Sequence, residues 1–405
     1  MKRYDSYKDS GIDWIGVIPE HWGITTIGRL TNLGRGRVIS AVEIAELEGV
    51  YPVYSSQTEN NGIMGLLNSF DFEGEYVTWT TDGANAGTVF YRNGRFNCTN
   101  VCGTMQPKDW RIIDLKFLPY YLNLCTKYAV RLDINPKLMN NMMANISFVV
   151  PSKSEQTAIA AFLDRKTVEI DRLIADKKRL IELYEEEKTT IFNQAVTKGL
   201  NPDVKMKDSG IEWLKEIPEH WEVKRLKYYF DLITDKKNYN NVRKIGLENI
   251  ESKTGRYIES DSDFEGDGIF FKKNDVLFGK LRPYLAKVWL AEFEGQAVGD
   301  FYVLRCKSAI SALFAKFRLL SYSFIEISNN STYGAKMPRV NWDFLADLPI
   351  AFPLLKEQLL IADHLESECA RINTKVEKTK KLIALLTEYR TTLISEVVTG
   401  KIKVT

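Results

Sequence analysis

The segment Lys8–Trp22 reads KDSGIDWIGVIPEHW, and the segment Lys207–Trp221 reads KDSGIEWLKEIPEHW, so the chain repeats itself. Eleven of the 15 positions are identical across an offset of 199 residues. A second echo follows downstream, because Glu155-Gln156 recurs as Glu357-Gln358 at an offset of 202. Such offsets are far longer than the roughly 20 to 50 residues of solenoid repeats. The sequence therefore predicts two copies of one domain-sized unit.

Composition places the chain among ordinary globular proteins. It has 405 residues, of which 44% are hydrophobic and 27% charged, and its net charge is +2. This length gives room for two or three hydrophobic cores. There is no run of about 18 apolar residues, and the start of the chain is polar and aromatic, so we expect a cytoplasmic protein with no membrane contact. The five cysteines are odd in number and scattered, which fits reduced thiols.

Each copy is expected to begin with an α+β globule. Residues 23–150 and 222–352 contain short alternating runs that predict strands between long loops. A helix is expected near Leu115–Tyr128. The predicted strands include Tyr76–Trp79, Thr88–Tyr91, Val276–Phe278 and Phe301–Leu304, together with two apolar runs closed by proline, Phe148–Pro151 and Ile350–Pro353.

A long helix is expected after each globule. Glycine and proline are absent from Glu155 to about Val196 and from about Lys356 to Val398, and apolar residues recur there at spacings of three, four and seven. This pattern predicts two amphipathic helices packed as a coiled coil, each about 60 Å long. Residues 155–198 hold 9 acidic and 8 basic side chains. Their charged faces are expected to meet solvent or a protein partner, with a plain spacer as the alternative.

Two copies of one unit in a single chain are expected to pack about a pseudo-twofold axis, which would make the helices antiparallel. The predicted fold is α+β, with two pseudo-twofold-related globular domains joined by two long antiparallel helices that form a coiled coil. The expected division places the globules at residues 1–152 and 201–354 and the helices at residues 153–200 and 355–405. Such a molecule suits a bipartite target on a duplex.

Known catalytic motifs are missing from the sequence. Asn135-Pro136-Lys137 is the nearest approach to an adenine methyltransferase active-site run, and it lacks the second proline and the aromatic residue. No GxxxxGK[ST] phosphate loop or HExxH zinc helix is present. Asp203 with Glu251 and Lys253 is the one arrangement that suggests a magnesium nuclease. We predict no catalytic and no metal-binding residue.

Two of the histidines belong to the repeated box. His21 and His220 occupy equivalent places in the two PEHW sequences, so a structural role is expected for both. The tryptophans of the box repeat in register as well and are expected to pack in a core or seam rather than to stack on bases. They are Trp14, Trp22, Trp213 and Trp221.

Taken together, these features resemble the specificity subunit of a type I restriction-modification system. The resemblance covers essentially the full length and rests on the doubled DSGI(D/E)W…IPEHW box and on the Pro-x-x-x-Glu-Gln-x-x-Ile starts at Pro151 and Pro353. The helix ends at Glu186–Thr197 and Glu388–Thr399 also resemble one another. Similar stretches within the globules are Tyr51–Ser56, Thr81–Gly87, Gly279–Tyr284 and Gly334–Arg339.

The resemblance implies a non-catalytic, DNA-binding subunit. Each globule would be a target recognition domain that reads one half of an interrupted double-stranded DNA sequence, while the helices set the spacing and dock two methyltransferase subunits. Restriction and motor subunits would join through the complex. S-adenosylmethionine, ATP and magnesium would belong to those partners, with no cofactor in this chain. The alternatives are a self-sufficient restriction-methylation enzyme and a coiled-coil adaptor without DNA contact.

DNA contacts are expected from local clusters, because residues 23–150 hold 11 basic and 11 acidic side chains and residues 222–352 hold 20 and 17. Arginine or lysine can read guanine, asparagine or glutamine can read adenine, and serine or threonine can contact base or phosphate. In the first globule we predict contacts from Arg35, Arg37, Ser55, Ser56, Gln57, Asn85 and Lys137. In the second we predict contacts from Lys236, Lys237, Arg243, Lys280, Arg282, Tyr284, Lys336 and Arg339.

Some of these residues also have a purely structural interpretation. Arg282 precedes Pro283 and could anchor a turn, and Lys236-Lys237 could form a solvated loop.

Overall fold

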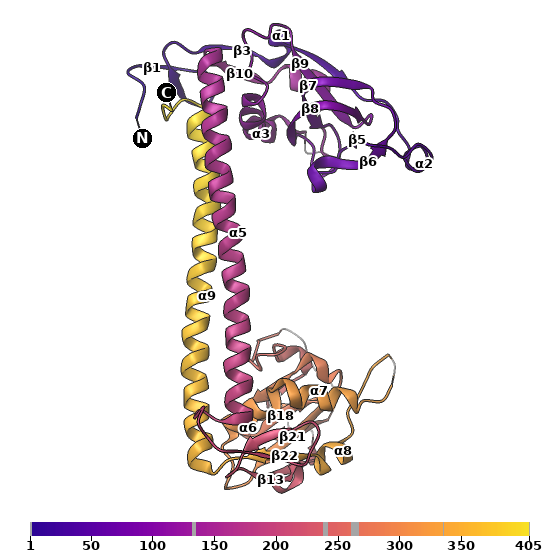
Figure 1. Cartoon of the computed structure of the whole chain (residues 1–405), viewed down its shortest axis with the longest axis vertical. Coiled ribbons are helices and arrows are strands. Elements are labelled where there is room, and N and C mark those ends of the chain that lie inside the picture. The colour runs from indigo at the N-terminus through magenta and orange to yellow at the C-terminus, as the bar shows by residue number, and fades with distance from the viewer. Residues whose placement is uncertain (1, 132–134, 238–241, 261–266, 335, 405) are drawn as a thin grey trace. The chain divides into compact units, whose positions relative to one another are not determined.

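A computed structural model describes residues 2–131, 135–237, 242–260, 267–334 and 336–404. The chain divides into two compact units. The first comprises Met1–Lys178 with Lys381–Thr405, and the second comprises Arg179–Lys380. Each unit therefore contains one α+β domain and a stretch of both long helices, α5 (Lys153–Lys198) and α9 (Leu355–Val398) (Figure 1).

The two long helices begin and end where the sequence predicts. α5 starts directly after Pro151-Ser152 and continues without a glycine or proline to Lys198. Gly199 follows with a positive φ of 78°, a left-handed conformation that ends helices and that glycine adopts without strain. α9 ends in the same way, because Gly400 has a φ of 73°.

Within each unit the helices lie side by side. In the second unit, Lys375 lies over the Tyr184 ring at 5.3 Å, and Arg371 forms an ion pair with Glu187 at 3.1 Å. The residue numbers of the partners on α9 decrease as the residue numbers on α5 increase, so the two helices are antiparallel there, as predicted. In the first unit Arg390 forms an ion pair with Asp171 at 2.8 Å. The pseudo-twofold relation between the domains stays a prediction.

The first unit is built around a six-stranded sheet of order β4-β9-β7-β8-β5-β6, with the small pairs β1-β2 and β3-β10 beside it. Its strands are β1 (Tyr7–Asp9), β2 (Val17–Pro19), β3 (Gly23–Thr26), β4 (Thr31–Arg35), β5 (Tyr51–Tyr54), β6 (Ile63–Leu67), β7 (Phe72–Thr80), β8 (Val89–Cys98), β9 (Cys102–Pro107) and β10 (Ser147–Val150). Its shorter helices are α1 (Ile27–Leu30), α2 (Ala41–Glu46), η1 (Glu59–Gly62), α3 (Phe117–Ala129) and α4 (Asn140–Ala144).

The second unit has two four-stranded sheets, β14-β21-β18-β19 and β15-β17-β20-β16, and the pairs β11-β12 and β13-β22. Its strands are β11 (Met206–Asp208), β12 (Glu216–Pro218), β13 (Glu222–Arg225), β14 (Phe230–Ile233), β15 (Lys236–Lys237), β16 (Lys244–Ile245), β17 (Gly268–Phe271), β18 (Val276–Gly279), β19 (Val288–Leu290), β20 (Gly295–Ala297), β21 (Phe301–Cys306) and β22 (Pro349–Phe352). Its shorter helices are η2 (Leu226–Tyr228), η3 (Leu247–Asn249), η4 (Pro283–Leu285), α6 (Ala312–Leu320), α7 (Tyr322–Asn330) and α8 (Trp342–Asp347).

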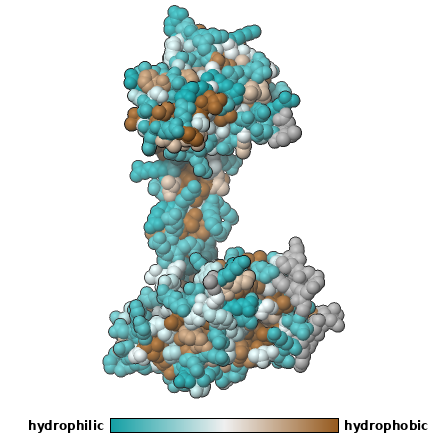
Figure 2. Space-filling model, turned by 90° about the vertical axis from the view of Figure 1, so that its right-hand side faces the viewer, coloured by the Kyte–Doolittle hydropathy of each residue, from teal (hydrophilic) through white to brown (hydrophobic). Residues whose placement is uncertain are grey.

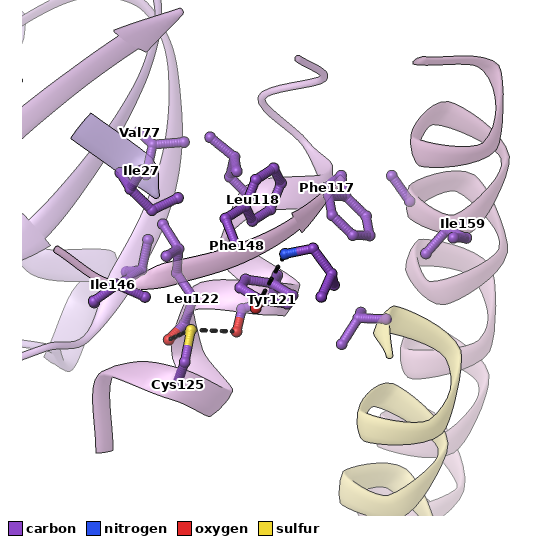
Figure 3. Packing of buried hydrophobic residues seen from close by; sticks show 14 of the residues in the cluster. Ile27, Val77, Phe117, Leu118, Tyr121, Leu122, Cys125, Ile146, Phe148 and Ile159 are labelled. Atoms are coloured by element: carbon purple, nitrogen blue, oxygen red, sulfur yellow. Dashed lines mark hydrogen bonds between the residues drawn. The ribbon is translucent and has the colours of Figure 1, made fainter. Parts of the chain in front are cut away.

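The main core of the first unit lies between the sheet, α3 and α5. Phe117 and Tyr121 of α3 and Phe148 of β10 are completely buried, and the Tyr121 and Phe148 rings meet edge to face with centroids 4.9 Å apart. Figure 3 shows these rings between the sheet residue Val77 and Ile159 of α5. Burial of such rings favours folding by about 2 to 3 kcal/mol each. The start of the long helix is therefore part of the domain core.

The repeated box joins each domain to its long helix. The Glu155 carboxylate lies 3.0 Å from His21 Nε2 and accepts a hydrogen bond from Trp22 Nε1 at 3.3 Å. In the second copy Glu357 makes the same two contacts, at 2.6 Å with the histidine and 3.2 Å with the tryptophan. The two box histidines are thus structural, as predicted.

Packing of the box tryptophans in the cores is also confirmed. Trp22 and Trp221 are almost completely buried, and Trp14 and Trp213 pack against the cores of their own domains. Across the described residues, the structure offers no helix whose length and apolar character would suit a membrane span.

Candidate nucleic-acid interface

In the first domain, several predicted DNA-contacting segments meet at the turn Thr99–Val101 between β8 and β9. The Thr99 hydroxyl donates to Ser55 Oγ at 3.3 Å. The backbone N–H of Thr81 donates to the carbonyl oxygen of Val101 at 3.0 Å. Arg35 Nε donates to the carbonyl oxygen of Asn100. The turn therefore brings Arg35, Ser55 and the loop that begins at Thr81 to one edge of the sheet.

The loop between β7 and β8, residues Thr81–Thr88, is held by a second segment from far along the chain. Asp82 and Lys137 form an isolated antiparallel bridge, and Asn135 Nδ2 donates to the Asp82 carboxylate at 2.5 Å. Asn85 lies exposed in the loop, and the Lys137 side chain is exposed as well. The structure thus places the predicted residues Arg35, Asn85 and Lys137 around the same loop.

Arg37, which we also predicted as a DNA contact, already has partners within the domain. Its guanidinium forms ion pairs with Glu43 at 2.6 Å and with Asp71 at 3.0 Å. The hydrogen bond with Glu43 raises the pKa of Arg37, and Arg37 in turn lowers the pKa of Glu43. Because Glu43 lies in α2, which the Ser40 side chain caps, Arg37 ties this helix to the sheet. Its donors would have to leave these carboxylates to reach DNA.

Ser56 and Gln57 lie in the segment that follows β5. The Gln57 side-chain amide donates to the carbonyl oxygen of Ile63, so part of its hydrogen-bonding capacity closes the turn before β6. Ser56 is partly buried and Gln57 is exposed. These two residues stay predictions, with Gln57 the more accessible of the two.

In the second domain five predicted residues lie around one loop, Lys280–Lys287. Leu281 and Arg339 form an isolated antiparallel bridge, and the backbone N–H of Arg282 donates to the Pro338 carbonyl at 2.8 Å. The predicted residues that meet there are Lys280, Arg282, Tyr284, Lys336 and Arg339; all but the partly buried Lys280 are exposed. Ala335, within the Gly334–Arg339 stretch, lies outside the described residues.

Asp300 connects two of these basic residues. Its carboxylate lies 3.8 Å from Lys280 Nζ and 3.0 Å from Arg339, so both cations are held at the base of the loop. Sequence reasoning missed Asp300, because the contact joins residues that are far apart in the chain. It also missed Thr99 and Asn100 of the first domain, whose role appears only once the strands are paired.

Lys236 and Lys237 form β15 of the other sheet of the second domain, and Arg243 directly precedes β16 of that sheet. Lys236 and Lys237 pair with Ile269 and Gly268 of β17, and the side chain of Lys237 lies outside what the structure describes. Arg243 is exposed and its guanidinium lies over the Phe293 ring at 4.6 Å. The structure therefore does not bring these three residues to the Lys280–Lys287 loop.

Among the described residues of both domains, no cluster of three or more histidine, cysteine, aspartate or glutamate side chains suited to a metal ion occurs. Glu251, a candidate for the nuclease alternative, accepts hydrogen bonds from Thr254 at 2.6 Å and from Arg256 at 3.2 Å, and these lower its pKa. On the visible faces of both domains, Figure 2 shows hydrophilic residues interspersed with hydrophobic ones.

Two α+β domains with one repeated frame, each displaying basic side chains beside a bridged loop, are the arrangement of a two-domain recognition protein. The chain belongs to the family of the type I restriction modification DNA specificity domain, whose model matches residues 19–183 and 218–384. The predicted function, DNA sequence specificity in a type I restriction-modification system with two recognition domains, is thereby confirmed.

Similar proteins carry the same description. The chain is 22% identical to the specificity subunit of the type I restriction enzyme EcoDI from Escherichia coli, over 96% of this chain and 90% of that one. It is 48% identical over 136 residues to a Mycoplasma pneumoniae protein named for the N-terminus of a type I specificity subunit, which covers 33% of this chain and 72% of the relative. Further Mycoplasma pneumoniae specificity subunits match over 37% to 56% of their own length.

The fold has solved counterparts. A chain from a structure on complex assembly and conformational transition of the type I restriction-modification system matches 95% of this chain and 99% of its own length, with a TM-score of 0.71 at 12% identity. At that identity the likeness concerns the fold alone, and it confirms the predicted α+β domains with long helices.

Proposed function

We propose that this chain selects the DNA target of a type I complex, with each domain reading one half of an interrupted double-stranded sequence. The observation that carries the proposal is that both domains form the same bridged loop but place different side chains on it. Lys137 closes the loop of the first domain and Arg339 closes that of the second. A repeated frame with different side chains suits two half-targets that differ in sequence.

The long helices are proposed to set the distance between the half-targets and to dock two methyltransferase subunits. Several apolar side chains on them are exposed although both helices are already paired. In the first unit these are Val168, Leu173, Leu385 and Tyr389, with exposed fractions of 67%, 47%, 61% and 47%. Figure 2 shows hydrophobic residues among hydrophilic ones along the visible part of the helices. Apolar side chains gathered on a helix pair are typical of surfaces that bind another protein.

Methyl transfer and restriction are assigned to partner subunits. In this proposal the chain is not an enzyme, and S-adenosylmethionine, ATP and magnesium bind to the methyltransferase and motor subunits. The family supports this division, because the matching model describes a DNA specificity domain. Action on DNA inside a bacterial cell would place the complex in the cytoplasm.

The test is to co-express the chain with the methyltransferase subunit encoded beside it in a host that lacks DNA methylation, and to map modified adenines across the genome. The expected result is an interrupted two-part motif that disappears when the methyltransferase is expressed alone. Methylation without any gap in the motif would contradict the two-reader model. A soluble complex that leaves the genome unmodified and fails to bind any duplex would favour the adaptor alternative.

A further inference from the structure

The loops Thr81–Thr88 and Lys280–Lys287 are equivalent parts of the two copies, because they are related by the same offset of 199 residues as the repeated box. Their backbones make matching hydrogen bonds. The N–H of Ala86 donates to the Gly83 carbonyl at 2.9 Å, and the N–H of Leu285 donates to the Arg282 carbonyl at 2.9 Å. Position by position, Arg282 in the second domain therefore stands where Gly83 stands in the first.

The bridging segments are equivalent as well. The N–H of Gly83 donates to Pro136 at 3.0 Å, and the N–H of Arg282 donates to Pro338 at 2.8 Å. The two prolines are related by an offset of 202, the same offset as the helix starts. Both the loop and the segment that holds it have therefore kept one backbone arrangement in the two copies.

The two loops differ in how easily their residues adopt this arrangement. In the first domain the left-handed positions are glycines, Gly83 with a φ of 89° and Gly87 with a φ of 87°. In the second domain Arg282 and Ala286 occupy them, each with a φ of 49°. Left-handed backbone is unfavourable for residues that carry a Cβ, and glycine adopts it freely. The proline after Arg282 adds a further restriction, since it favours extended conformations at the preceding residue.

No contact within the described part of the protein accounts for an arginine at this place. The Arg282 side chain is exposed, and among the described residues its guanidinium has no hydrogen-bond or ion-pair partner. The neighbouring cations of Lys280 and Arg339 are both held by Asp300. Strained residues without a structural reason occur most often at functional sites. The exposed guanidinium is therefore available for a partner outside the chain.

We infer that Arg282 is a specificity-determining residue of the second domain and reads a guanine in the half-target of that domain. Phosphate contacts carry no sequence information and would serve both copies equally, whereas here the backbone is kept and the side chain differs. The guanidinium can donate two parallel hydrogen bonds to guanine O6 and N7. The first domain, with Gly83 at the equivalent place, reads its half-target without a side chain there. This inference rests on the proposed function.

The test measures binding of the purified complex of this chain with its methyltransferase subunits to duplexes that carry the mapped target. Each base pair of the second half-target is changed in turn. For the wild-type complex, changing one G·C pair should weaken binding about 5- to 150-fold. Arg282→Gly should lose the same factor on the intact target and should no longer distinguish bases at that position, while discrimination elsewhere is kept.

Two further variants separate the explanations. Ala286→Gly relieves the same backbone strain without removing a long side chain, so it should bind like the wild type. Arg282→Lys keeps a positive charge but loses the planar pair of donors of the guanidinium, so it should discriminate guanine at that position less well than the wild type and better than Arg282→Gly. A loss that is equal on all duplexes, with the discrimination at every base pair kept, would mean a phosphate contact and overturn the inference. Wild-type binding by Arg282→Gly would also overturn it.

Folding and the parent proposal are controlled in the same experiment. The melting temperature of Arg282→Gly should not be lower than that of the wild type, because glycine suits the left-handed backbone. If the wild-type complex recognises no two-part target, the proposed function fails, and the inference fails with it. If the wild type recognises its target and Arg282→Gly shows unchanged selectivity, the inference alone is wrong.

Discussion

At the scale of single residues, the same residue type serves different ends in this protein. Arg37 is neutralised by Glu43 and Asp71, whereas Arg282 has no such partner among the described residues and occupies a strained backbone. Both stand in short basic motifs, and both are exposed. Only the surrounding side chains distinguish the two cases: Arg37 holds a helix in place, whereas Arg282 is free to contact DNA.

Glu155 allows a prediction about pH. Burial favours a higher pKa for this carboxyl group, but the hydrogen bonds from His21, Ser152 and Trp22 outweigh burial, so its pKa is lowered from the ordinary value of 4.5. A lowered pKa stabilises the fold above about pH 4.5, and this contribution is lost as the pH falls further. Glu155→Gln should therefore lower the free energy of unfolding by about 1 kcal/mol at pH 7.

The difference should shrink as the pH falls below 4.5 towards the lowered pKa of the folded carboxyl group, because the wild-type side chain then becomes protonated as well. Urea unfolding of the full chain at pH 7 and pH 3.5, followed by tryptophan fluorescence, gives both values. An equal loss at both pH values would mean that the ionised carboxylate is not what stabilises the box.

At the scale of elements, each long helix is fastened to its domain by one buried glutamine. Gln156 accepts a hydrogen bond from the Asp114 N–H at 2.9 Å and donates to the carbonyls of Ile112 and Pro151 at 2.8 and 2.9 Å. Gln358 repeats the pattern at the start of α9. The start of each long helix is therefore hydrogen-bonded to the domain that it follows, and the proposed role of the helices in setting the distance between half-targets requires such an attachment.

Replacing this glutamine tests the attachment. Gln156→Leu removes the hydrogen bonds to one buried carbonyl group and to two partly buried backbone groups, so we expect a loss of about 1 to 3 kcal/mol in the stability of the first unit. Gln194→Leu, on an exposed face of the same helix, should change stability by less than about 0.5 kcal/mol. Thermal unfolding by calorimetry measures both, and a similar effect of the two variants would argue against the fastening role.

At the scale of the whole molecule, two separate units imply two separable readers. Exchanging residues 23–150 for the equivalent region of a relative should change one half of the methylated motif and leave the other half and the gap unaltered, because the helices and the second unit are untouched. Genome-wide methylation mapping of the exchanged protein measures this. A change in both halves, or in neither, would be incompatible with two independent recognition domains.

Much of the architecture could be predicted from the sequence. The repeated box, the strand runs before Pro151 and Pro353, and the extents of α5 and α9 depend on local patterns or on internal identity, so they are visible without coordinates. Gly83 and Arg282 are also related by the offset of 199 residues. Their equivalence becomes clear only once the backbone bridges that hold the two loops are known.

Only the tertiary structure decided which candidate residues share a site. The bridges Asp82–Lys137 and Leu281–Arg339 join segments that are 55 and 58 positions apart, and no local pattern announces them. Asp300 and the turn Thr99–Val101 act through contacts of the same kind. The sequence by itself determined that this protein consists of two copies of one domain, each with a long helix, because hydrophobic periodicity and repetition are properties of neighbouring residues. The grouping of its polar side chains depends instead on strand pairing across the domain, which is set by the packing of the whole core.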